Sequence, residues 1–279
     1  MKKLLFLFTF TLLFVGCKSE KTVTQSALGA VKASCVLGKW NDSRLPLTIK
    51  LSPDFSGDIT AGSMVDGLNP LEQMAKAWNS AATPKTLMTV PFGTTANNGF
   101  SDTASFKDSE IGIYKSPQWF SNVQSQAIAI TQYYGIVTSS EGLGQYIELT
   151  HADIIVNYHD YGSELTMNVN PTFDYDLPTV ILHEMGHLVG LCHEGVQPSI
   201  MDPYYYNTQR SLKAFDIDSI QDIYIDGAIT KSNNTNALSM PLGTEVKGTI
   251  ELHANGKCIH YLNGKKTLEH VVEKIKKHK

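Results

Sequence analysis

The spacing of apolar and polar positions predicts strands mixed with one helix in the first part of the chain. Residues 45–51 alternate between apolar and polar side chains, which is typical of a half-buried strand. Residues 69–82 carry apolar side chains at helical spacing, with Asn69 as the N-cap and Pro70 at the first position. Alternation and β-branched residues predict further strands at residues 86–90, 127–137, 152–158 and 164–169.

Two helices are predicted to close this region. Residues 177–189 have the composition of a helix, which Asp176 caps and Gly190 ends. Residues 213–224 form the last predicted helix. Strands and one helix followed by two helices indicate an α+β (α/β-like) domain over residues 39–226, with a mixed sheet.

The C-terminal part is predicted as a separate small module. Residues 227–246 are rich in Asn, Ser and Thr and are typical of a linker. Residues 247–279 then predict a β-hairpin, with Asn-Gly turn signals at 255–256 and 263–264, and a helix over 268–277. Eight Lys against three Glu make this module basic. Two interpretations stay open, a contact with anionic lipid or polysaccharide and a solvated surface.

The N-terminus has the pattern of an export signal. Basic residues precede an apolar run over residues 4–15, which is shorter than the roughly 20 residues of a membrane-spanning helix. The junction before Cys17 resembles the lipobox of bacterial lipoproteins, although Phe14 stands where Leu is usual. The resemblance implies a signal peptide over residues 1–16, acylation of Cys17 and a tether over residues 17–38. The alternative is a plain signal peptide that contains a Cys.

Size, charge and cysteine content restrict the choices further. The chain has 279 residues, enough for one domain of about 150–200 residues with appendages. A net charge of −4 gives no reason to expect a nucleic-acid partner. Cys35, Cys192 and Cys258 leave one disulfide possible in an oxidising compartment, with at least one free thiol. Their pairing cannot be deduced from the sequence.

The motif HExxHxxGxxH, which begins at His183, is the strongest chemical signal. His183 and His187 are four residues apart on one helix face, so that both imidazoles can reach one ion. Gly190 can end the helix in a left-handed conformation, and His193 then supplies a third ligand. Catalytic zinc takes three protein ligands and keeps one position for water. Glu184 lies next to the first ligand, where it can act as general base.

This pattern resembles the metzincin family of zinc peptidases, and the matrixin branch is most similar. The family implies a Met-containing turn beneath the metal, and residues 199–203 (SIMDP) resemble it, with Met201 as an apolar support. Residues 152–156 are similar to the matrixin strand that lines the cleft, and residues 212–224 to the closing helix. The resemblance implies a metzincin fold, with a twisted mixed sheet, an active-site helix and a C-terminal helix.

The resemblance also implies a function, a cofactor and a substrate cleft. We expect a zinc-dependent endopeptidase with one catalytic Zn²⁺, acting on protein or peptide substrates. The substrate is expected to add a strand to the sheet edge along residues 152–157. The expected cleft residues are Ala152, Ile154, Val156, Tyr204, Tyr205 and Tyr206. Astacins have a metal-binding Tyr where this chain has Pro203, so a Tyr ligand is disfavoured.

Several alternatives remain open from the sequence. Calcium is an alternative second cofactor, with Asp160, Glu164 or Asp174 as candidate ligands, although no loop pattern supports it. A structural second zinc is not expected. Cys35 is either a latency thiol for the metal, a tether residue or half of a disulfide.

Two other functions compete with the peptidase. One is a lipid-anchored binding or adhesion protein on a catalytically idle metzincin scaffold, and the other is a zinc hydrolase for non-peptide bonds. The undamaged motif favours the peptidase. The export signal predicts lipid anchorage to a bacterial membrane, with the outer membrane favoured because Lys18, and not an Asp, follows Cys17.

Overall fold

The computed structural model describes most of the chain beyond its N-terminal segment. Contacts divide the chain into two units, Met1–Ala30 and Val31–Lys279. The described residues all belong to the second unit and are 36–96, 101–169, 175–193, 198–205, 207–230, 240–255 and 257–271. The predicted signal peptide, Cys17 and Cys35 lie outside them. Within these described ranges, no helix has both the length and the apolar character to cross a membrane.

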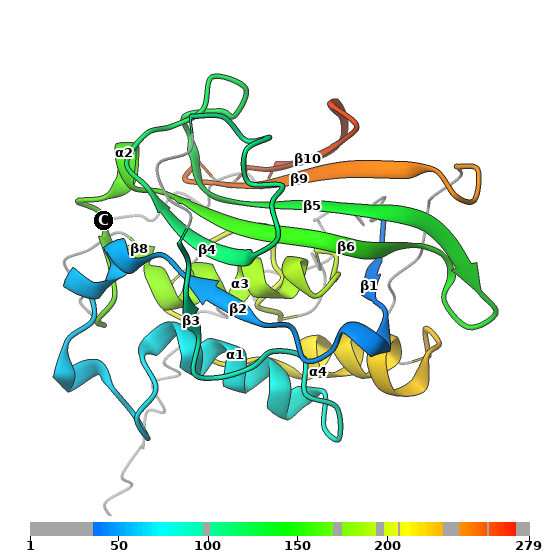
Figure 1. The fold of residues 1–279 in the computed structure, drawn as a ribbon, viewed down its shortest axis with the longest axis horizontal. Coiled ribbons are helices and arrows are strands. Elements are labelled where there is room, and N and C mark those ends of the chain that lie inside the picture. Colours follow the sequence, from blue (N-terminus) through cyan, green and yellow to red (C-terminus); the bar gives the residue numbers. More distant parts are fainter. Residues whose placement is uncertain are drawn as a thin grey trace, which may run out of the picture. The chain divides into compact units, whose positions relative to one another are not determined.

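A mixed sheet of nine strands forms the centre of the domain (Figure 1). Its strands are β1 Gly38–Trp40, β2 Ile49–Leu51, β3 Gly93–Thr94, β4 Ile111–Ser116, β5 Ala127–Ser140, β6 Gly144–Asn157, β9 Glu245–His253, β10 Lys257–Leu262 and β11 Lys265–Val271. The order is β11-β10-β9-β5-β6-β4-β2-β3, and β1 pairs with β6. Strands β1 to β4 and β6 pair in parallel, whereas β5 and β9 to β11 run antiparallel to their neighbours. The predicted α+β class with a mixed sheet is confirmed.

Three helices, α1 Pro70–Ala81, α3 Leu177–Leu188 and α4 Ala214–Gln221, lie on the same side of this sheet (Figure 1). In α1 the Asn69 side chain accepts from the N–H groups of Leu71 and Glu72, and Glu72 accepts from the N–H of Asn69 in return. This reciprocal capping box fixes the start of the helix and confirms Asn69 as the predicted N-cap. The Trp78 indole donates to the carbonyl of Leu182 and so joins α1 to α3.

The motif helix α3 lies entirely inside the domain, because every one of its residues is buried. A helix that is apolar on most sides is expected in such a position. Its N-cap Asp176 accepts from the N–H of Thr179 and pairs with Arg210, whose guanidinium is 2.5 Å from the carboxylate. These contacts fix the start of the helix that carries the predicted metal ligands.

Several predicted elements are shorter than expected or were missed. Residues 86–90 contribute only an isolated bridge between Leu47 and Met88, and residues 164–169 contain the short strand β7 Leu165–Thr166, which pairs with β8 Tyr175–Asp176. A short helix α2 covers Tyr158–Tyr161. The last predicted helix is α4, continued by a π-helical segment, Asp222–Asp226.

The predicted separate C-terminal module is wrong, because β9 continues the main sheet. Strand β9 pairs antiparallel with β5, from Glu245 opposite Ile136 to His253 opposite Ala127. The predicted helix over residues 268–277 is also wrong where the chain is described, since β11 extends to Val271. Pairing with β10 gives this segment backbone hydrogen bonds on one side, and such tertiary contacts outweigh a weak helical spacing.

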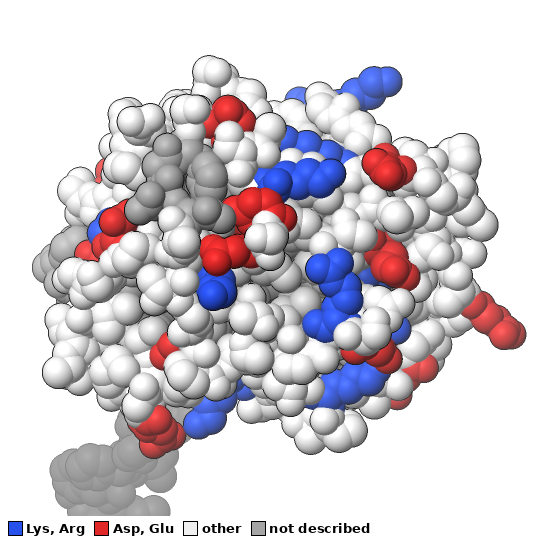
Figure 2. All heavy atoms as spheres, viewed as in Figure 1, with Lys and Arg blue, Asp and Glu red and all other residues white. Residues whose placement is uncertain are grey.

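The basic character of the C-terminal segment is partly neutralised where the structure describes it. The ammonium groups of Lys257 and Lys266 lie 3.0 and 2.6 Å from the Glu269 carboxylate. Figure 2 shows Lys and Arg interspersed with Asp and Glu across the viewed face. The described residues of this segment are therefore strands of the sheet with locally paired charges.

Candidate metal centre

Three imidazoles from the motif meet in the interior of the domain. The Nε2 atoms of His183 and His187 are 3.1 Å apart, and each lies 3.2 and 2.9 Å, respectively, from Nε2 of His193. His183 and His187 project from one face of α3, and His193 reaches them after the chain turns at Gly190. The three nitrogens therefore point at one small volume.

Backbone carbonyls set the orientation of two of these rings. Nδ1 of His183 donates to the carbonyl of Ile200 at 2.7 Å, and Nδ1 of His187 donates to the carbonyl of Leu191 at 2.9 Å. Because a carbonyl only accepts, Nδ1 carries the proton and Nε2 keeps its lone pair. Such an outer hydrogen bond is typical of metal-binding histidine and fixes its tautomer.

The donor set fits a tetrahedral zinc ion. With Zn–N bonds of about 2.0–2.1 Å, tetrahedral geometry places ligand nitrogens about 3.3–3.4 Å apart, close to the distances between these rings. Burial lowers the pKa of His183 to about 4, so this ring stays neutral, as a ligand must be. His183, His187 and His193 are thus a buried group with the spacing of metal ligands.

Glu184 is the carboxylate beside this group, and one of its oxygens has no protein partner. Its Oε2 accepts a hydrogen bond from the Thr131 hydroxyl on β5 at 2.5 Å. Its Oε1 is buried and has no hydrogen-bond partner among the described residues. Burial raises the pKa of Glu184 to about 8, and the Thr131 hydrogen bond acts in the opposite direction. An unpaired buried oxygen is costly and indicates a position meant for a ligand or a reacting group.

The bend that brings His193 to the site depends on two glycines in contact. Gly190 has φ +98°, and a Cβ at this position would lie 2.0 Å from the carbonyl oxygen of Gly38 on β1. The N–H of Gly38 donates to the carbonyl of Gly190 at 2.9 Å. The Trp40 indole and the Tyr224 hydroxyl donate to carbonyls at the end of α3. Distant parts of the chain therefore hold the turn between the second and third imidazoles.

Met201 packs against α3 at Gly186. A Cβ on Gly186 would lie 2.2 Å from Sδ of Met201, so this glycine allows the thioether to approach the helix next to His187. Asp216 on α4 accepts from the N–H of Ile200 and from the Ser199 hydroxyl, which anchors the turn. The turn thus carries both the apolar support and the carbonyl that orients His183.

Comparisons with known proteins agree with this geometry. Residues 96–225 match the family described as Matrixin. Karilysin from Tannerella forsythia is 43% identical over 49 residues, which are 18% of this chain and 10% of the relative. Matrix metalloproteinase-26 from Homo sapiens is 49% identical over 53 residues, 18% of this chain and 20% of the relative. The chain contains a matrixin-like metzincin domain. The matched segments span a tenth and a fifth of these two relatives.

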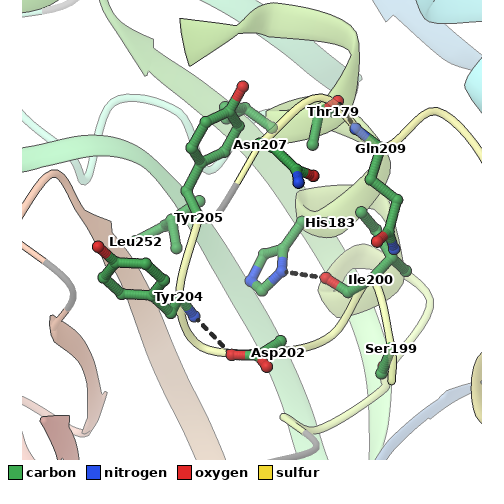
Figure 3. Close-up of a pocket in the computed structure, with 11 residues that line it drawn as sticks. Thr179, His183, Ser199, Ile200, Asp202, Tyr204, Tyr205, Asn207, Gln209 and Leu252 are labelled. Atoms are coloured by element: carbon green, nitrogen blue, oxygen red, sulfur yellow. Dashed lines mark hydrogen bonds between the residues drawn. The ribbon is translucent and has the colours of Figure 1, made fainter. Parts of the chain in front are cut away.

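A pocket beside the three imidazoles of the matrixin-like domain is lined by His183, Tyr204 and Tyr205 (Figure 3). The Tyr205 hydroxyl accepts from the N–H of Asp176 at 2.8 Å and ties this wall to the start of α3. Tyr206, which was also expected here, lies outside the described residues. Leu252 of β9 also lines this pocket, next to the two tyrosines (Figure 3).

The prediction that the substrate lies along residues 152–157 is wrong. Ala152, Ile154 and Val156 belong to β6, which is fully buried there. β6 pairs with β5 on one side and with β4 on the other, so its backbone offers no free edge to a peptide. In the matrixin-like domain, the strand next to the Glu184 carboxylate is β5, as the Thr131 contact shows.

The cysteine and calcium expectations are resolved only in part. Cys192 is disulfide-bonded, and Cys258 is a buried free thiol. Both groups of residues with metal-ligand spacing in the described ranges contain His193, and neither includes Asp160 or Glu164. Calcium is therefore unsupported at these two, and Asp174 lies outside the described residues.

Sequence reasoning missed several residues of the site. Thr131 and Asp216 carry no motif that marks them, because each acts through a contact with a distant segment. Cys258 Sγ lies 3.3 Å from Nε2 of His193, and His260 Nε2 lies 2.8 Å from Nδ1 of the same ring. Their spacing of two residues, which places both on one face of a strand, was the available signal.

Proposed function

We propose that the chain is a zinc-dependent endopeptidase, with His183, His187 and His193 as metal ligands and Glu184 as general base. The observation that supports this most directly is the convergence of three Nε2 atoms within 3.2 Å beside a buried carboxylate. The matrixin-like domain around them supports peptides as the substrate class.

The chain's own residues supply positioning and proton transfer. When bound, the zinc ion supplies Lewis-acid chemistry, which polarises the scissile carbonyl and makes water a stronger acid. Glu184 takes a proton from the attacking water as the water oxygen bonds to the carbonyl carbon. It then delivers that proton to the amine nitrogen as the C–N bond breaks, which leaves a carboxyl group and an amine. Thr131 holds Oε2, which leaves Oε1 for this proton. The carbonyls of Ile200 and Leu191 accept from Nδ1 of His183 and His187, respectively, and so keep Nε2 of both rings free to bind the metal.

The fold also supports a position for the peptide. A substrate strand reaches Glu184 by pairing along β5 when that edge is free, because an extended peptide binds most readily at the edge of a sheet. In this structure β9 occupies the edge. The pocket next to His183 then accepts one substrate side chain between Tyr204 and Tyr205. Its aromatic walls favour an apolar group at that position.

We also propose that the protein is exported and held at a bacterial membrane by acyl groups on Cys17, with the outer membrane favoured. The apolar N-terminal run and the lipobox-like junction support this. In a bacterial host, metabolic labelling with a fatty-acid analogue should mark the chain and should not mark Cys17→Ser. An unlabelled parent chain would refute the anchor.

A metal assay and a peptide-library digest test the peptidase together. The chain that starts at residue 18 should bind one zinc ion and cleave library peptides at a measurable rate, even if slowly, and a chelator should abolish this cleavage until zinc is returned. The variant His187→Ala should lose the metal. A protein that binds no zinc through these histidines would refute the proposal.

A further inference from the structure

The edge of β5 at which a substrate would pair is covered by the chain itself. Strand β9 runs antiparallel along β5 over nearly its whole length, and Figure 1 shows the two side by side. Residue Ile250 lies opposite Thr131, the residue that holds Glu184. The backbone hydrogen bonds that a peptide would make there are therefore already made within the chain.

Strand β10, which follows β9, brings the thiol of Cys258 close to the three imidazoles. Cys258 and His260 on β10 are cross-strand partners of Leu252 and Ile250 on β9. Cross-strand partners share a face of the sheet, so all four face the same side as Thr131. Cys258 Sγ lies 3.3 Å from Nε2 of His193, the atom that faces the metal, and Cys258 is fully buried.

The distance from Cys258 Sγ to Nε2 of His193 is close to that between two ligands of one zinc ion. With Zn–S of about 2.3 Å and Zn–N of about 2.0–2.1 Å, a thiolate ligand lies about 3.6 Å from a ligand nitrogen. His260 completes the arrangement, since its Nε2 lies 2.8 Å from Nδ1 of His193 and so orients the third ring. His193, Cys258 and His260 form the second group with metal-ligand spacing in the described part of the chain, and it shares His193 alone with the group of His183, His187 and His193.

The hairpin also leaves no room for a substrate at the reacting atoms. The three imidazoles are at most 4% exposed, and Glu184 is 0% exposed. Leu252 of β9 forms a wall of the pocket beside His183. The segment matched by the matrixin family ends at residue 225, before β9 begins at Glu245. The strands that cover β5 therefore lie outside the segment that matches the family.

We propose that Cys258 is the fourth ligand of the catalytic metal and that strands β9 and β10 hold the peptidase latent by occupying its substrate edge. This inference rests on the proposed function. On binding the ion, the Cys258 thiol releases its proton to solvent and fills the position that water needs. Activity then requires that the hairpin leave the cleft, which exposes the edge of β5 and the metal together.

Cobalt substitution of the full chain tests the ligand directly. Co²⁺ bound by a thiolate has an intense near-ultraviolet charge-transfer band, whereas Co²⁺ bound by imidazoles alone has only weak visible bands. We expect one Co²⁺ per chain with the intense band in the parent protein, and loss of that band with retained Co²⁺ in Cys258→Ser. The control Ile259→Val, whose side chain lies on the other face of β10, should keep the band.

Peptide cleavage by the zinc forms of the same proteins tests latency. Cys258→Ser should cleave peptides about tenfold faster or more than the parent, because activity follows the population of the open state. Ile259→Val should match the parent. The assignment of Cys258 as a ligand would be wrong if the parent chain lacked the band, if the band persisted in Cys258→Ser, or if each chain bound two Co²⁺. An unchanged rate of peptide cleavage in Cys258→Ser would show that the thiol does not hold the peptidase latent. Failure of the proposed function would look different from failure of this inference. If the histidines bound no metal, the parent would bind no more Co²⁺ than His187→Ala.

Discussion

The Thr131 hydroxyl on β5 donates a hydrogen bond across 2.5 Å to Oε2 of Glu184 on α3. This contact joins the edge strand of the matched domain to the carboxylate that we propose as general base. It fixes the direction of Oε1, and it stabilises the charged form of a carboxylate that burial disfavours. We therefore expect Thr131 to position this carboxylate and to lower its pKa.

Replacing Thr131 by Val should move the acidic limb of the pH profile to higher pH. Loss of the hydrogen bond raises the pKa of Glu184 further, and the base acts only when deprotonated, so less of it is active at neutral pH. We expect kcat/KM at pH 7 to fall roughly tenfold, the usual effect of one lost hydrogen bond to a charged group. The comparison is made with zinc bound, in the Cys258→Ser background.

The matched control for this prediction is Thr138→Val on the same strand, at the end away from α3. It should leave the pH profile unchanged. A profile for Thr131→Val that superimposes on that of its parent would show that the contact has no part in setting the protonation of Glu184.

Replacing Glu184 by Gln should separate metal binding from catalysis. The amide keeps the size of the side chain and cannot accept the proton from water, so kcat should fall by about 10²–10⁴-fold. The zinc content should stay at one per chain, because Glu184 is not among the grouped ligands. Metal analysis and peptide hydrolysis, each also measured with Cys258→Ser, check both parts. Substantial hydrolysis by the Gln variant would assign the base elsewhere.

The parts of the site that could be predicted from the sequence depend on local spacing. His183 and His187 face one side of a helix because they are four residues apart, and Gly190 marks the bend before His193. The capping box that starts α1 at Asn69 is local in the same sense. Each of these patterns spans only a few residues, so tertiary structure cannot easily change its meaning.

The parts that could not be predicted depend on pairing between distant segments. The apolar run around Ile154 fits a strand buried on both faces as well as one that lines a cleft, and only the pairing of β6 with β4 and β5 decides. The hairpin that carries Cys258 has the sequence of an independent module, since nothing local shows that β9 docks on β5. Thr131 and Asp216 matter for the same non-local reason.

Replacing Gly190 by Ala should destabilise the fold and weaken zinc binding together. The added Cβ would lie 2.0 Å from the carbonyl oxygen of Gly38, so the bend before His193 must shift. Gly227→Ala is the matched control, because Gly227 also has positive φ (+64°) but no atom lies within 4 Å of the added Cβ. The free energy of unfolding of this control should fall by about 1–2 kcal/mol, which is the cost of the left-handed conformation alone.

The clash with the carbonyl of Gly38 should add to that cost, so that the free energy of unfolding of Gly190→Ala falls by about 3 kcal/mol or more. Urea unfolding of the metal-free proteins measures the two losses, and competition with a chromogenic chelator measures zinc affinity. Equal losses for the two variants would show that the approach of Gly38 does not constrain the bend.

Acid should destabilise the metal-free protein through His183. Burial lowers the pKa of this ring from 6.5 to about 4 in the folded protein, so between these values the unfolded chain binds a proton that the folded chain does not. Stability therefore rises with pH in this window, and the cost is absent above about pH 6.5 and complete near pH 4. Urea unfolding of the metal-free chain at pH 7, 6 and 5 should show this fall in the free energy of unfolding. His183→Gln should flatten it, whereas His159→Gln, at an exposed histidine outside the site, should not. An identical slope in His183→Gln and the parent would mean that this ring is protonated in the folded protein, and its Nε2–H would then need an acceptor in addition to the Ile200 carbonyl that Nδ1–H already contacts.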